Sequence, residues 1–177
     1  MNYHNITYPD MNNGNGLRVV LWLSGCSHHC YNCQNPQTWD INSGIPFDES
    51  AKEELFRELD KDYISGLTLS GGDPLHEANL DGVLELVNEI RLLLPNKSIW
   101  LYTGFRYEDC LIKPKMCEEN IFRALRYEIL KNVDVMVDGR YIDAQRNPSK
   151  KWAGSDNQRV IDTRKSLEQN KIVLYCN

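Results

Sequence analysis

Three of the six cysteines lie within eight residues of one another. Cys26, Cys30 and Cys33 are separated by three and then two residues in the run CSHHCYNC. A loop this short can wrap around one metal centre, and cysteine thiolates are the usual ligands of iron–sulfur clusters. Three ligands leave one iron of a four-iron cube open to a small molecule. The spacing therefore favours a [4Fe–4S] cluster with one free coordination position.

Two other kinds of site fit part of this pattern. A structural zinc ion prefers four ligands, and His28 or His29 inside the loop would supply the fourth. However, no second Cys or His pair follows at the usual distance. A redox dithiol of Cys30 and Cys33 leaves Cys26 without a role. The remaining cysteines are scattered and are treated as incidental: Cys110, Cys117 and Cys176.

The chain as a whole limits the possible partners. Its 177 residues suit one domain, predicted to span residues 1–177, and 25 acidic against 20 basic residues give a net charge of −5. This balance argues against nucleic-acid binding, which usually needs a basic face. No apolar stretch approaches the roughly 20 residues of a membrane span, and the start MNYHNITYPD lacks the features of a signal peptide. We expect no membrane partner and a cytoplasmic location.

Apolar runs alternate with amphipathic segments along the chain. Strands are predicted over 18–24, 66–70, 98–103, 133–137 and 172–175, and helices over 48–63, 79–94 and 121–130. Asp48 is placed to cap the first helix, Pro95 ends the second, and the third is expected to bury Ile121, Phe122, Leu125 and Ile129. The stretch 140–170 is expected to be mostly loop with one short helix.

This alternation predicts parallel strands joined by crossover helices. About five strands are too few for a closed eight-stranded barrel. We therefore predict an α/β fold with a mostly parallel sheet, arranged as a partial (open) βα barrel. The loops SGC, SGGDP, YTG and VDGR each follow a predicted strand, so they are expected to converge at one rim, where ligands bind in such folds.

The cysteine spacing is the signature of the radical S-adenosylmethionine enzymes, and the loop from Cys26 resembles it closely. SGGDP resembles the GGE/GGD motif of the same superfamily, which binds the methionyl amine, so the resemblance places Gly72 and Asp73 against S-adenosylmethionine. The superfamily often has an aromatic residue before the third cysteine, where this chain has Asn32. The resemblance therefore implies adenine contacts through the backbone of Asn32, Cys33 and Gln34. The resemblance also implies the fold of the radical S-adenosylmethionine enzymes.

Longer matching stretches narrow the resemblance. They run from Met1 to Asp162 and include NGNGLRVVLWLSGC, NPQTWDINSG, LSGGDPLH, WLYTGF, VDGRY and GSDNQRVID. Along them the chain is similar to the family of proteins that activate anaerobic ribonucleoside-triphosphate reductases. This similarity implies an enzyme that uses its cluster and S-adenosylmethionine to generate a glycyl radical on the large subunit of that reductase. A flavodoxin-type protein would donate the electron, and no catalytic residue is needed beyond the cluster and cofactor.

Several alternatives stay open at this point. The nearest alternatives are an activator of another glycyl-radical enzyme, such as pyruvate formate-lyase, and a 7-carboxy-7-deazaguanine synthase. A non-catalytic zinc-binding module is the alternative from a different class. Further candidate residues are Tyr102, Thr103 and Gly104 for the cofactor pocket, Asp138 for a ribose contact or a helix cap, His76 for a surface or packing role, and Trp39 with residues 154–159 for docking the target glycine.

Overall fold

A seven-stranded sheet forms the centre of the computed structural model, which describes residues 1–111 and 121–175. Cys117 and Cys176 lie outside the described residues. The spatial order of the strands is β3-β1-β2-β4-β5-β6-β7. Their bounds are β1 Asn2–Asp10, β2 Arg18–Leu23, β3 Ile45–Pro46, β4 Gly66–Gly71, β5 Ser98–Tyr102, β6 Val135–Asp138 and β7 Arg159–Asp162.

The four central strands are parallel. β2 pairs with β4, β4 with β5, and β5 with β6. The outer strands β1, β3 and β7 pair antiparallel with their neighbours. An α/β fold with a mostly parallel central sheet is therefore confirmed, and its two edges are antiparallel.

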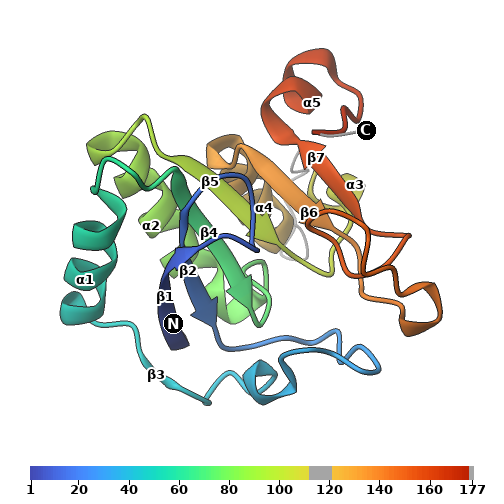
Figure 1. Cartoon of the computed structure of the whole chain (residues 1–177), viewed down its shortest axis with the longest axis horizontal. Helices are drawn as coiled ribbons and strands as arrows, with labels where there is room; N and C mark the ends of the chain where they lie inside the picture. The colour runs from blue at the N-terminus through green and yellow to red at the C-terminus, as the bar shows by residue number, and fades with distance from the viewer. Residues whose placement is uncertain (112–120, 176–177) are drawn as a thin grey trace.

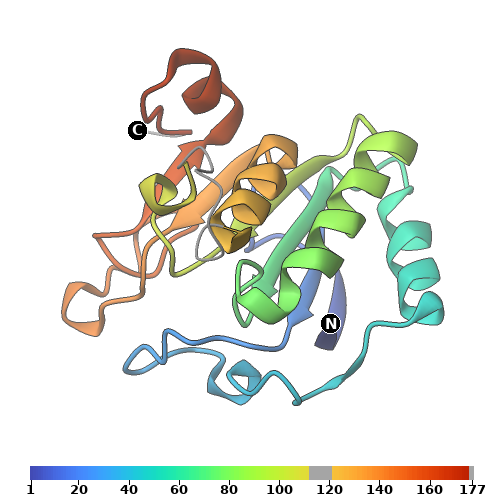
Figure 2. The same cartoon turned by 180° about the vertical axis from the view of Figure 1, so that it is seen from behind.

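Helices cover one face of the sheet. Figure 2 shows α2 (Leu80–Leu93) and α4 (Ile121–Asn132) in front of the sheet, with α1 (Glu49–Leu59) beside them. The short helices α3 (Tyr107–Cys110) and α5 (Thr163–Gln169) follow β5 and β7. As predicted, Asp48 caps α1, since its Oδ1 accepts a hydrogen bond of 3.0 Å from the backbone N–H of Ala51.

The opposite face of the sheet carries a different set of side chains, because alternate residues of a strand point to opposite faces. Here Arg18, Thr68 and Trp100 are buried. The loop 11–17 crosses this face (Figure 1) and is held there by hydrogen bonds from Thr68 Oγ1 to the Asn13 carbonyl, 2.7 Å, and from Arg18 Nη1 to the Asn15 carbonyl, 3.1 Å. This loop covers part of the sheet face that lies opposite the helices.

Some predicted elements differ from the structure. The segment 172–175 forms only an isolated bridge between Leu174 and Ile161 instead of a strand. The predicted loop 140–170 contains β7 as well as α5, and the antiparallel strand β1 was not predicted. Ile121 is 59% exposed, contrary to prediction, because α4 buries its later turns around Ile129 and Leu130. No helix in the described ranges is long and apolar enough to cross a membrane.

Candidate iron–sulfur and cofactor site

The three cysteines lie on the loop that leaves β2, residues 24–33, which we call the cluster loop. Figure 1 shows it running past the carboxyl ends of the parallel strands. Its start is held by backbone hydrogen bonds from Gly25 N–H to the Thr38 carbonyl, 2.7 Å, and from Cys26 N–H to the Trp39 carbonyl, 3.0 Å. His29 has a left-handed φ of 45°, which lets this short loop fold back.

The loop after β4 packs directly on the cluster loop. Gly72 N–H donates to the Leu23 carbonyl and Asp73 N–H to the Gly25 carbonyl, each over 2.7 Å. A Cβ atom on residue 72 would lie 2.6 Å from the Gly25 carbonyl oxygen, so only glycine allows this approach. The glycine pair therefore brings the β4 loop against the loop that bears the cysteines.

Asn79 adds a side-chain link between the same two loops. It is 2% exposed, and its Nδ2 donates to the carbonyls of Ser24, 2.8 Å, and Asp73, 3.0 Å. The sequence indicated only that a helix begins at this residue. A buried amide that bridges two carbonyls satisfies polar groups that would otherwise be costly to bury.

Replacing Gly72 with alanine is expected to destabilise the protein by about 1–3 kcal/mol, because the new methyl group collides with the cluster-loop backbone. Gly82→Ala is the control: Gly82 lies in the first turn of α2, and the three atoms nearest to an added Cβ all belong to the flexible Met1 side chain, so a change of less than about 1 kcal/mol is expected. Urea unfolding measures both. Equal effects of the two substitutions would contradict the close approach of the loops.

The Asp73 carboxylate is engaged inside the protein. It is 2% exposed and accepts hydrogen bonds from Leu75 N–H, 2.8 Å, from Thr103 Oγ1, 2.8 and 2.9 Å, and from Gly104 N–H, 3.0 Å. His28 Nε2 of the cluster loop lies 2.8 Å from its Oδ2. Asp73 therefore joins the loops after β2, β4 and β5.

The three thiols are partly buried and suited to iron. Burial raises the pKa of Cys26 to about 11, while the backbone amides of His28 and His29 hydrogen-bond to its sulfur and act in the opposite direction. Cys33 Sγ accepts a hydrogen bond of 3.4 Å from Asn35 N–H. Such N–H···S bonds tune iron–sulfur clusters, whose protein ligands are thiolates, so this donor set fits a [4Fe–4S] cluster. Iron must displace the Cys26 proton on binding.

The histidines that a zinc site would use are turned to other partners. His28 faces Asp73, and the ring of His29 packs on Trp39 with centroids 4.8 Å apart. Within residues 1–111 and 121–175, no three His, Cys, Asp or Glu side chains are grouped to hold a single metal ion. Both histidines are therefore shown with partners other than the cysteines.

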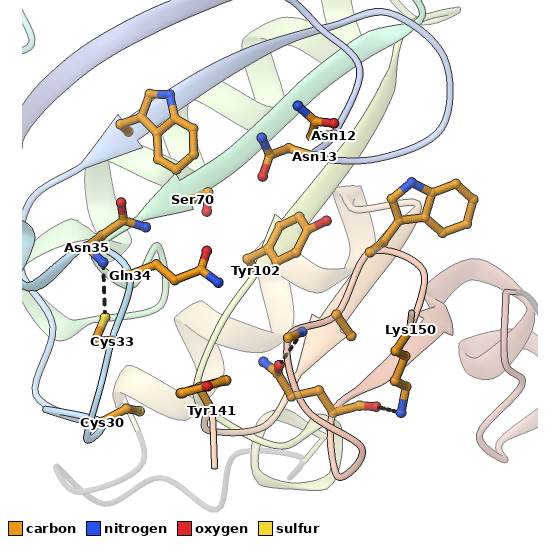
Figure 3. A pocket seen from close by; sticks show the side chains of 15 residues that line it. Asn12, Asn13, Cys30, Cys33, Gln34, Asn35, Ser70, Tyr102, Tyr141 and Lys150 are labelled. Atoms are coloured by element: carbon orange, nitrogen blue, oxygen red, sulfur yellow. Dashed lines mark hydrogen bonds between the residues drawn. The ribbon is translucent and has the colours of Figure 1, made fainter. Parts of the chain in front are cut away.

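A cavity of about 380 Å³ opens beside the cysteines, on the sheet face opposite the helices. Figure 3 shows Cys30, Cys33 and Gln34 on one side of it, Lys150 on the other, and Tyr102 between them. Its volume lies in the range of small-molecule sites, about 300–1,000 Å³. The lining comprises Asn12, Asn13, Trp22, Cys30, Cys33, Gln34, Asn35, Ser70, Tyr102, Tyr141, Lys150, Trp152, Ala153, Gly154 and Gln158.

Only some of the predicted cofactor residues line this cavity. Cys33 and Gln34 line it, whereas Asn32, Gly72 and Asp73 are not among its described lining residues. Asn32 is exposed near the end of the cluster loop, with a left-handed φ of 54°.

Other candidates from the sequence have structural partners. Tyr102 lines the cavity, while Thr103 and Gly104 hold the Asp73 carboxylate. Asp138 is buried and accepts a 2.8 Å hydrogen bond from Tyr107 N–H at the start of α3, so of its two predicted roles the structure shows helix capping. His76 Nδ1 accepts from the Ala78 N–H.

The two segments suggested for docking the target glycine have different neighbours in the structure. Gly154 and Gln158 line the cavity, but Trp39 packs on His29. Cys110 is fully buried in the core, and burial raises the pKa of its thiol to about 12, so it stays protonated. This placement agrees with its treatment as a residue without a role at the site.

Comparison with known proteins identifies the class first. Residues 12–161 match the family described as "4Fe-4S single cluster domain". The cysteine loop, with its partly buried thiols, lies within the matched region.

Individual relatives narrow the class further. The anaerobic ribonucleoside-triphosphate reductase-activating protein of Enterobacteria phage T4 is 44% identical over 90% of this chain and 93% of its own length. The proteins of the same name from Escherichia coli K12 and Vibrio cholerae are 37% and 39% identical, over 90% and 89% of this chain and 97% and 96% of their own. The chain belongs to the family of anaerobic ribonucleoside-triphosphate reductase-activating proteins.

Proposed function

We propose that this protein activates an anaerobic (class III) ribonucleoside-triphosphate reductase by generating a glycyl radical on its large subunit. The observation that carries the proposal is the 37–44% identity to activating proteins over about nine-tenths of both chains. The match includes the three cysteines at the rim of the sheet, beside a cavity large enough for a cofactor.

Cys26, Cys30 and Cys33 would hold the [4Fe–4S] cluster, and the adjoining cavity would receive S-adenosylmethionine. Bound there, the cluster would supply the one-electron reduction that cleaves S-adenosylmethionine to methionine and a 5′-deoxyadenosyl radical, with a flavodoxin-type protein as the electron donor. A hydrogen atom taken from the target glycine would then convert that radical to 5′-deoxyadenosine and leave the glycyl radical on the partner. The chemistry belongs to the cofactors, and the protein supplies position and shielding.

The chain's own residues would have defined roles around this cofactor. The backbone of Asn32, Cys33 and Gln34 is proposed to contact the adenine, and Gly72 allows close approach to the methionyl end. Asp73 is likewise proposed to lie against the methionyl end, and its carboxylate, which accepts hydrogen bonds from three residues, would also hold the loops in place around the cofactor.

The finer description of the fold belongs to this proposal as well. The sheet, with helices on one face and a cavity on the other, would act as a partial βα barrel of the radical S-adenosylmethionine type, with residues 1–177 as one domain. The target glycine would enter the cavity past residues 154–159, since Gly154 and Gln158 line it. A cytoplasmic location stays a prediction.

Anaerobic reconstitution tests the proposal. The protein is expected to turn brown, and after one-electron reduction with S-adenosylmethionine it should release methionine and 5′-deoxyadenosine in equal amounts. With the reductase present, electron paramagnetic resonance should detect a glycyl radical on that partner. Pyruvate formate-lyase is the control substrate. A radical on formate-lyase alone would reassign the target, and a colourless protein holding one zinc ion would overturn the cluster.

A further inference from the structure

One residue of the cluster loop contacts the loops that leave the three other parallel strands. His28 lies two residues after Cys26 and two before Cys30, and its side chain is 13% exposed. It touches the β4 loop at Asp73, the β5 loop at Gly104 and Phe105, and the β6 loop at Arg140. The sequence presented it only as an alternative zinc ligand.

The imidazole ring is held on its polar and its apolar sides. Nε2 lies 2.8 Å from Asp73 Oδ2, although within the described residues its N–H makes no well-aligned hydrogen bond. The ring meets Phe105 edge to face, with centroids 4.7 Å apart and planes at 73°. The Arg126 guanidinium carbon lies 4.0 Å from the centroid of the Phe105 ring and Arg126 Nε donates to the Leu75 carbonyl, so the wall behind the imidazole is itself fixed.

Gly104 makes room for this ring. A Cβ atom there would lie 2.3 Å from His28 Cδ2 and 2.6 Å from Cγ and Nε2. The φ angle of Gly104 is not in the left-handed region, so backbone conformation alone does not require glycine at this position. What excludes a side chain is the imidazole. The His28 carbonyl meanwhile accepts a hydrogen bond from Arg140 Nη2.

The neighbouring histidine provides an internal comparison. His29 is exposed, and its ring packs on Trp39, which belongs to the segment that follows the cluster loop. The two histidines therefore share one loop and are adjacent in sequence between Cys26 and Cys30. Only His28 is shown in contact with the loops after β4, β5 and β6.

We propose that His28 is a positioning residue, which fixes the cluster loop against the three other strand-end loops before iron is bound and retains it there afterwards. The inference rests on the proposed cluster site but not on the target protein or on radical chemistry. It gives Asp73 and Gly104 a shared purpose, since the Asp73 carboxylate lies against the Nε2 edge of the imidazole and Gly104 leaves space for the ring.

Matched asparagine substitutions test the proposal on the full chain. Asparagine at 28 is too short to reach Asp73 and Phe105 together, whereas at 29 it tolerates the left-handed backbone. In the iron-free protein, His28→Asn should speed amide hydrogen exchange of residues 26–33 roughly tenfold, and His29→Asn less than about twofold. In the reconstituted protein, His28→Asn should likewise speed loss of the brown absorption to an iron chelator.

A double-mutant cycle separates the imidazole contact from general damage. Gly104→Ala alone should speed exchange of the cluster loop, because its methyl group displaces the His28 ring. In the His28→Asn background the same alanine should have much less effect, since the ring it collides with is gone. Purely additive effects would overturn the assigned contact.

The outcomes distinguish this inference from the proposed function. Equal exchange in the His28→Asn and His29→Asn proteins would overturn the positioning role even if the enzyme is active. Selective loosening by His28→Asn in a protein that yields no glycyl radical would support the positioning role while refuting the function.

Discussion

Alanine in place of Cys30 is expected to abolish cluster binding and all release of 5′-deoxyadenosine. Cys30 lies at the mouth of the cavity, and a cube that needs three protein thiolates cannot be held by two. Iron content after anaerobic reconstitution should fall from about four ions per chain to fewer than one. Because the residue is only partly buried on a loop, the free energy of unfolding of the iron-free protein should change by less than about 1 kcal/mol.

Cys110→Ala is the matched control, for which we expect a change in stability but none in iron content. Its sulfur is fully buried in the core at the end of α3, so its removal should cost about 1 kcal/mol or more of stability and leave the iron content unchanged. Iron and sulfide assays with urea unfolding of the iron-free proteins measure both quantities. A full cluster in the Cys30 variant would mean that the ligands are wrongly assigned.

The second large effect is expected at Arg18, which is 0% exposed at the start of β2. Its guanidinium donates to Thr68 Oγ1 over 2.6 Å and to the Ser98 carbonyl and hydroxyl over 2.9 and 3.0 Å, and it lies 5.4 Å from the Trp100 ring centroid. Burial lowers its pKa to about 10, so it still carries its charge at neutral pH. Carbonyl and hydroxyl oxygens stabilise this buried cation by accepting its hydrogen bonds.

Arg18→Met should therefore destabilise the protein by about 3 kcal/mol or more, because it removes the donors and leaves buried oxygens without them. It should also loosen the loop 11–17, since the Asn15 carbonyl loses its partner. Arg164→Met is the control: Arg164 is more than half exposed and pairs with Asp134, so a loss below about 1 kcal/mol is expected. Urea unfolding of the two variants measures these changes in the free energy of unfolding. Equal losses of stability would show that the buried network around Arg18 contributes little.

Much of the fold was predictable where one physical signal dominates. The parallel strands β2, β4, β5 and β6 are apolar runs that end at glycine or Asp-Gly, and α1 begins at the capping residue Asp48. Strand-end loops of parallel sheets meet at one rim, so their convergence followed from topology, and hydrogen bonds between the loops confirm it.

The antiparallel edges of the sheet were harder to predict. β1 reads NYHNITYPD, and its polar residues and proline give no clear strand pattern; it is half exposed, and only the two-residue strand β3 lies outside it. β7 has only four residues, RVID, and depends on pairing with β6 instead of on its own pattern. Such short strands are determined by the neighbours they meet in space, which a local pattern does not contain.

In the site, too, residues with a local sequence pattern were predictable, and residues whose partners are distant in sequence were not. The cysteine spacing is local, and it identified the ligands proposed here. Asn79 and His28, by contrast, act on residues 55 and 45 positions away, so their side chains gain a purpose only when the loops are assembled. An asparagine at the start of a predicted helix and a histidine between cysteines were the available signals, and each had a simpler local interpretation.

The contact between His28 and Arg140 spans 112 residues of chain and bears on the order of assembly. We expect contacts between residues so far apart in sequence to form late in folding, because closing a long loop costs conformational entropy before the contact contributes its favourable free energy. The three cysteines are neighbours in sequence, but their surroundings are complete only once β6 has joined the sheet. Iron would then meet a chain that has already folded, which makes cluster insertion a step that follows folding rather than one that directs it.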